Sequence, residues 1–170
     1  MSLTIERILV PTDFSPDADH AMHYAATLAK DVGAELFIMH VLPEEEGLLP
    51  FSRGEIQEMY DYPLDYPLDQ IFDDLKKVVE RRFAAIVTEE TKRGIRIRPL
   101  IYSGKPAQEI VQAAMLHDID LIVIATHGRT GLAHVLLGSV AEKVVRFAPC
   151  PVLTIKHPDR VQGNQRKQAL

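Results

Sequence analysis

Short apolar runs alternate with amphipathic segments along most of this 170-residue chain. Three of the runs, at residues 5–11, 35–42 and 120–125, consist mainly of large apolar residues. Strands that are buried on both faces have this composition, and they are typical of parallel sheets covered by helices. The alternation therefore predicts an α/β fold built around a parallel sheet.

Two further strand-like runs, at residues 95–102 and 151–156, contain Pro99 and Pro151 respectively. Proline has no N–H to donate to a neighbouring strand, so these runs belong at sheet edges or at the start of a strand. Placing strands three and five at the edges gives the order 3-2-1-4-5. The flavodoxin-like order 2-1-3-4-5 fits less well, because it would put the uniformly apolar second strand at an edge.

Helices are predicted between these strands. Apolar residues recur at helical spacing over 16–32 and over 70–93, and a glycine follows each segment. Pro106 begins a third helix and Ser139 a fourth. The whole pattern predicts an open, five-stranded parallel sheet with helices on both faces.

Two segments are predicted to border one crevice. In the order 3-2-1-4-5 the chain reverses direction between strands one and four, and ligands of open α/β sheets bind at such a reversal. Strand one is followed by Pro11, Thr12 and Asp13, and strand four by a glycine-containing loop over 125–139. We therefore expect a single pocket beyond the carboxyl ends of these strands.

The loop over 125–139 predicts a bound phosphate. Gly128 and Gly138 have no β-carbon, so backbone N–H groups there can approach an anion closely. A helix that starts at Ser139 adds N–H groups aligned with its dipole. Ser139 and Glu142 also have the spacing of a capping box, in which the serine serves only the helix start. The two interpretations are compatible, and we favour phosphate binding.

Three polar residues near the crevice have alternative interpretations. Asp13 either complements the dipole of the first helix or accepts hydrogen bonds from ribose hydroxyls and helps to hold a divalent cation. Arg129 either binds phosphate oxygens or lies in solvent, and His127 contacts either a nucleotide or solvent.

A Ser-His-Asp hydrolase is not expected, because the chain lacks a Gly-x-Ser-x-Gly turn. A structural zinc site is not expected either, because no third ligand lies at a zinc-like spacing.

Composition limits the classes of function. The formal net charge of −5 argues against nucleic acid as a partner, because no basic field covers the domain. Cys150 is the single cysteine, so no internal disulfide can form, and no apolar run approaches the length of a membrane span. We therefore expect a cytoplasmic protein without a membrane partner.

One domain is predicted over residues 1–157, followed by a flexible polar tail over 158–170. The acidic segment 43–69 separates the second strand from its helix and is longer than most connections in compact domains. We expect it to be a flap beside the pocket, a contact element for a protein partner, or a passive insertion.

These features resemble the universal stress protein family, specifically its ATP-binding branch, over nearly the whole chain. The resemblance rests most of all on the loop after strand four. There the family's phosphate motif, Gly-x-x-Gly, nine residues, then Gly-Ser/Thr, appears with Ala125 in place of the first glycine. Supporting segments are 10–15 after strand one, His40-Val41 at the end of strand two, 104–107 before the third helix and 149–153 at the last strand.

The resemblance implies a Rossmann-like fold that binds ATP together with Mg²⁺ or Mn²⁺. Pro11, Thr12 and Asp13 would line adenine and ribose, with Asp13 also serving the metal, and the Val41 backbone would contact the adenine edge. The residues implied near the ribose and the phosphates are Ala125, His127, Gly128, Arg129, Gly138, Ser139 and Val140. Family members commonly form homodimers through the last strand, here 151–156, which would otherwise be an exposed apolar edge.

The expected function is that of a nucleotide-responsive regulatory or stress-resistance factor. ATP would bias the loop over 125–139, together with the flap, between two arrangements, and an unknown protein partner would sense the difference. One alternative is a slow ATPase or autophosphorylating enzyme, in which Asp13 positions a metal or water. Another is a partner-binding module with a vestigial nucleotide pocket, in which the segment 43–69 makes the contact.

Overall fold

The computed structural model describes residues 4–43, 56–58, 71–128 and 137–158. These residues form a five-stranded parallel sheet with the order β3-β2-β1-β4-β5. The strands are β1 (Arg7–Pro11), β2 (Glu35–Leu42), β3 (Arg96–Ser103), β4 (Leu121–Ala125) and β5 (Val152–Ile155). The predicted order is confirmed, and the two edges are the strands that Pro99 and Pro151 marked.

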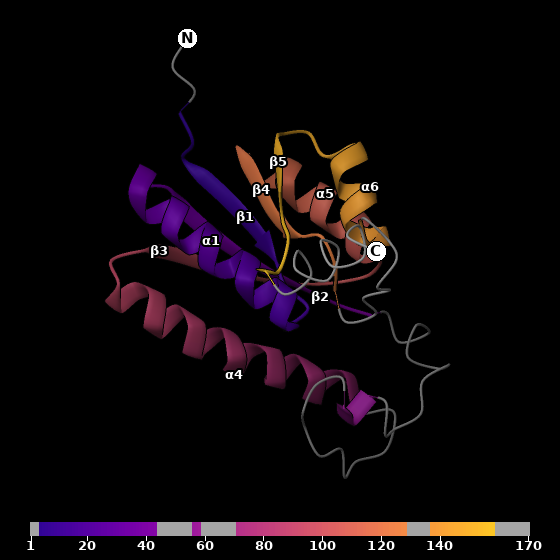
Figure 1. Cartoon of the computed structure of the whole chain (residues 1–170). Coiled ribbons are helices and arrows are strands. Elements are labelled where there is room, and N and C mark those ends of the chain that lie inside the picture. Colours follow the sequence, from indigo (N-terminus) through magenta and orange to yellow (C-terminus); the bar gives the residue numbers. More distant parts are fainter. Residues whose placement is uncertain (1–3, 44–55, 59–70, 129–136, 159–170) are drawn as a thin grey trace, which may run out of the picture.

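Helices cover both faces of the sheet, as the sequence predicts. They are α1 (Pro16–Val32), α4 (Ile71–Lys92), α5 (Pro106–Leu116) and α6 (Ser139–Phe147). Helices α1 and α4 pack on one face, and α5 and α6 pack on the other (Figure 1). Within the described ranges, no helix combines the length and the apolar character needed to cross a bilayer.

Helix α1 lies close against the central strands because its buried face is made mainly of alanines. It contacts β1, β4 and β5. Ser15 caps its start, since the Ser15 Oγ accepts a hydrogen bond from the Ala18 N–H at 3.2 Å. Gly33 ends it in the left-handed conformation, at φ 73°. The alanines of the buried face are Ala18, Ala21, Ala25, Ala26 and Ala29.

Each central strand is buried on both sides, which explains the continuous apolar runs. In β1, Ile8 and Val10 belong to the core under α1 and α4, whereas Leu9 belongs to the core under α5 and α6. Larger side chains fill the space under α4, where Leu75 and Phe83 are almost fully buried.

The predicted insertion and tail fall largely outside the described residues. Within 43–69, a short helical stretch over 56–58 is described, and its Ile56 side chain is buried in the core under α1 and α4. The domain bounds, and the role of the insertion as flap or partner contact, stay predictions.

Candidate functional site

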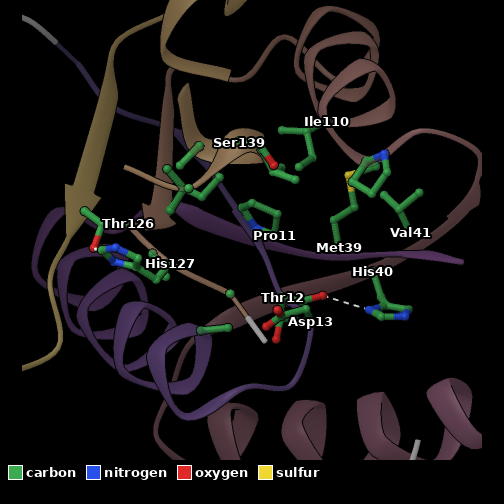
Figure 2. A pocket seen from close by; sticks show the side chains of 18 residues that line it. Pro11, Thr12, Asp13, Met39, His40, Val41, Ile110, Thr126, His127 and Ser139 are labelled. Atoms are coloured by element: carbon green, nitrogen blue, oxygen red, sulfur yellow. Dashed lines mark hydrogen bonds between the residues drawn. The ribbon is translucent and has the colours of Figure 1, made fainter. Parts of the chain in front are cut away.

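A cavity of about 310 Å³ lies at the carboxyl ends of β1, β2 and β4, where the strand order reverses (Figure 2). Its walls come from residues 11–13, 39–41 and 124–128 at the strand ends and from 138–141 at the start of α6. This volume is within the range of small-molecule sites. All of the predicted site residues except Arg129, which is outside the described residues, line this cavity.

One end of the cavity is an apolar slot. Met39 and Val41 project from β2, Ile110 from α5, and Pro11 lies between them at the end of β1 (Figure 2). No charged side chain belongs to this group, so the slot suits a flat, apolar portion of a ligand.

The end of β1 is held in place by hydrogen bonds on both sides of Thr12. Its N–H donates to the Met39 carbonyl at 2.8 Å, and its own carbonyl lies 2.7 Å from Nδ1 of the buried His40 (Figure 2). Because a carbonyl oxygen can only accept, Nδ1 carries the proton and donates. The Phe14 ring packs on the His40 ring at a centroid distance of 4.8 Å, with Phe14 at φ 60°.

Asp13 is oriented by the backbone that follows it. Its Oδ1 accepts a hydrogen bond from the Ser15 N–H at 3.0 Å, and its other oxygen faces Gly128. Ser15, rather than Asp13, supplies the side-chain cap of α1. The carboxylate of Asp13 therefore lines the cavity and also accepts a hydrogen bond from the residue that caps α1, so its two interpretations are compatible.

His127 is part of the cavity wall rather than a surface residue. Its side chain is buried, and its Nδ1 lies 3.0 Å from the Thr126 hydroxyl. The alternative that His127 simply faces solvent is wrong, because only 9% of the residue is exposed.

The start of α6 differs from the predicted capping box. Gly138 is the cap residue, at φ −64° and ψ 155°, and no side chain makes a cap hydrogen bond. Ser139 is the first helical residue, and the Glu142 N–H donates to the Gly138 carbonyl at 2.9 Å. The capping-box prediction is wrong because the helix begins one residue earlier than the Ser-x-x-Glu spacing requires.

Backbone N–H groups at this helix start divide into two kinds. The Gly138 N–H donates to the Thr126 carbonyl at 2.6 Å, so it is used within the protein. The N–H groups of Ser139, Val140 and Ala141 precede the first intrahelical hydrogen bond and have no acceptor within the helix. All three residues line the cavity, so this first turn offers donors aligned with the helix dipole.

Charged groups gather beside Asp13. Burial raises the pKa of Asp19, the neighbouring negative charge of Asp13 raises it further, and the Arg82 guanidinium lowers it. Arg82 also lies over the Phe14 ring, 4.8 Å from its centroid. Asp19 therefore experiences charges of both signs, from Asp13 and from Arg82.

Comparison with known proteins decides the family, since the model of the universal stress protein family matches residues 4–156. This chain belongs to the universal stress protein family. Among its relatives, universal stress protein MJ0531 of Methanocaldococcus jannaschii is 32% identical over 155 residues, which make up 91% of this chain and 84% of the relative.

Solved structures show the same fold as this universal stress protein. The structure of the hypothetical protein MJ0577, also from Methanocaldococcus jannaschii, has a TM-score of 0.73 at 28% identity and covers 91% of this chain and 97% of its own. A universal stress protein from Archaeoglobus fulgidus, solved in complex with dAMP, has a TM-score of 0.58 at 23% identity. The match covers 91% of this chain and all of the other, 100%.

Several cavity residues of this universal stress protein were not predicted from its sequence. Met39 could have been found, because it precedes the predicted Val41 by two positions in a strand and so shares its face. Thr126 occupies a variable position of the phosphate motif over 125–128, whereas Ile110 enters through the packing of α5 and no local pattern marks it.

Proposed function

We propose that this universal stress protein binds ATP and acts as a nucleotide-responsive regulatory or stress-resistance factor. One observation carries the proposal: a single cavity joins an apolar slot to the N–H groups of the first turn of α6. A nucleotide has the matching polarity, with a flat base at one end and phosphates at the other.

The ligand would lie along the cavity in one direction. Adenine would occupy the slot formed by Met39, Val41 and Ile110, with the Val41 backbone at its polar edge. The ribose would pass Ala125 and Asp13, whose carboxylate is a suitable acceptor for ribose hydroxyls. The phosphates would then reach Gly128, Ser139 and Val140, with His127 in the wall beside them.

Mg²⁺ or Mn²⁺ would accompany the nucleotide, held by Asp13 and by phosphate oxygens. Among the residues that the structure describes, no group of three or more His, Cys, Asp or Glu side chains could hold a metal alone. Mg²⁺ commonly binds through one or two carboxylates together with phosphates, so a single carboxylate at this position fits that chemistry.

The class of ligand is one that another protein of this fold holds, since the Archaeoglobus fulgidus protein was solved with dAMP. The position of the site supports a regulatory role. The cavity takes residues from the loop before α1 and from the start of α6, which cover opposite faces of the sheet. A bound nucleotide would therefore contact both helical layers, and a protein partner could detect the resulting change in either layer.

Two substitutions at one position test the phosphate contact. Ser139→Ala removes the hydroxyl and keeps the N–H, whereas Ser139→Pro removes both. Proline is favoured at the first position of a helix, and Gly138 before it already has the extended conformation that a following proline requires. Both variants are therefore expected to fold with an unchanged melting temperature.

Binding of Mg²⁺-ATP and of adenosine is measured for each variant by calorimetry. A hydrogen bond to a charged group contributes about 1.5–3 kcal/mol, so the step from Ala to Pro should weaken ATP about tenfold or more. Adenosine has no phosphate, and its affinity should stay the same in all three proteins. If the wild-type protein binds neither ligand, or if ATP binding is the same in all three, the proposal is wrong.

A further inference from the structure

A second and larger cavity, of about 870 Å³, lies between α5 and α6. The two helices run side by side on the same face of the sheet (Figure 1). Val111 and Met115 of α5 face it at a spacing of four residues, and Val140 and Phe147 of α6 at a spacing of seven. The proposed nucleotide site makes no use of this volume.

The two cavities share a wall. Pro106, Ser139 and Val140 line both of them. Ser139 and Val140 are also the residues assigned to the phosphates. A substituent on the terminal phosphate of a nucleotide held there would therefore lie next to the second cavity.

The charge of the second cavity suits an anionic ligand. Lys105 and Lys143 belong to its lining, and no acidic residue does. Among the described residues, the ion pairs involve neither lysine. In a dinucleotide, the second ribose would need a carboxylate that accepts hydrogen bonds from the ribose hydroxyls. The lining of the second cavity contains no carboxylate, which argues against a dinucleotide.

The remaining lining suits a ligand group that contains both amides and hydrocarbon. Met115 and Phe147 are large apolar side chains, 57% and 61% exposed. Large apolar side chains exposed together mark surfaces that a ligand or partner covers. Gln108 and Gln112 stand beside them on α5 and can exchange hydrogen bonds with amide groups.

We infer that the site takes an adenine nucleotide whose phosphates carry a long, partly apolar arm, a class that includes dephospho-coenzyme A and its thioesters. The arm would pass Ser139 and lie between α5 and α6, with its amides near Gln112 and its hydrocarbon end over Met115 and Phe147. Asp13 favours the form with a free ribose, because a phosphate on the ribose would meet its carboxylate. This inference rests on the proposed nucleotide site.

Calorimetry with three probes tests the inference: ADP, dephospho-coenzyme A and its S-octanoyl thioester. The thioester should bind at least about tenfold more tightly than ADP, a gain that requires burial of only about two methylenes. Met115→Asp should remove this gain and leave ADP binding unchanged. The matched control is Leu116→Asp, because Leu116 is exposed on the same helix and does not line the cavity. Phe147→Ser provides a second, independent variant.

The possible outcomes separate the two proposals. If ADP binds and the thioester binds no more tightly, the inference about the arm is wrong and the nucleotide site stands. A gain that survives both Met115→Asp and Phe147→Ser also overturns it, because the arm then lies elsewhere. If no probe binds the wild-type protein, the nucleotide site itself is wrong.

Discussion

The Asp13 carboxylate fills the space in which a side chain at residue 128 would begin. An ideal β-carbon on Gly128 would lie 2.5 Å from Oδ2 of Asp13 and 3.5 Å from its Cγ. Real β-carbons do not approach other atoms so closely. A β-carbon at 128 would therefore have to displace this carboxylate, whatever ligand the loop also admits.

Gly128→Ala is expected to displace Asp13 and to destabilise the protein by about 1–3 kcal/mol, the usual cost of overpacking. Replacing Asp13 by alanine removes the obstructing atoms, so Gly128→Ala should cost much less in an Asp13→Ala background. Urea unfolding of the four proteins in this double-mutant cycle measures the coupling. Equal costs of Gly128→Ala in both backgrounds would contradict the contact.

His40→Leu is expected to destabilise the protein by about 1–3 kcal/mol, because the buried Thr12 carbonyl loses its donor. His40→Asn should recover part of the loss, since its amide nitrogen can take the place of Nδ1. Leucine at 40 should also weaken ATP binding, because Thr12 and Asp13 would no longer be held at the end of β1. Denaturant unfolding and calorimetry provide the two measurements, and identical values for the Leu and Asn variants would refute the role of the hydrogen bond.

Asp13 and Arg82 are expected to change the pKa of Asp19 in opposite directions. Burial is the largest cause of the raised pKa of Asp19, and the charge of Asp13 is the second; the charge of Arg82 lowers this pKa. Asp13→Asn should therefore lower the pKa of Asp19, and Arg82→Gln should raise it. Carboxyl ¹³C chemical shifts followed through an acid titration report both changes, and a shift of the same sign in both variants would be inconsistent with the arrangement.

The raised pKa of Asp19 also predicts a pH dependence of stability. The folded state holds its proton to a higher pH than the unfolded chain, so stability falls as pH rises between the unfolded and folded pKa values. Asp19→Asn should therefore raise the melting temperature at pH 7 and make no difference under acid conditions in which both states are protonated. A gain that is the same at both pH values would point to a cause other than titration.

The exposed edge of β5 is expected to pair with a second copy of the chain. Strand β5 is at the end of the sheet, and Leu153 on it is 40% exposed. Leu153→Arg should convert a dimer into a monomer, as measured by light scattering after size exclusion. Leu116→Arg, which changes an exposed leucine on α5, should leave the mass unchanged. A monomeric wild-type protein would remove the basis for this expectation.

The fold could be predicted from the sequence because its signals are local and repeated. Pro99 and Pro151 marked the edges, and the continuous apolar runs marked the central strands, so the strand order followed from a few residues. The bounds of α1 were predicted correctly because Ser15, Pro16 and Gly33 signal its two ends.

The site could be predicted only in part, because some of its contacts join residues that are distant in the chain. The segments of the family motif meet at one cavity, as expected. The hydrogen bond from His40 to Thr12 and the contact of Asp13 with Gly128 depend on side-chain orientations at the ends of paired strands, which no local pattern encodes. The Ser-x-x-Glu spacing was misleading because the extended Gly138 takes the cap position, which makes Ser139 the first residue of α6.

The alanine face of α1 leaves no room for a larger side chain between this helix and the central strands. A larger side chain at Ala25 would push the helix axis away from β1 and β4, and the whole of α1 would move as a rigid body. Ten residues of helix span about 15 Å, so the displacement would reach the turn that carries Asp13. Larger side chains at the alanines of this face are therefore expected to disturb the site, even at positions far from any ligand.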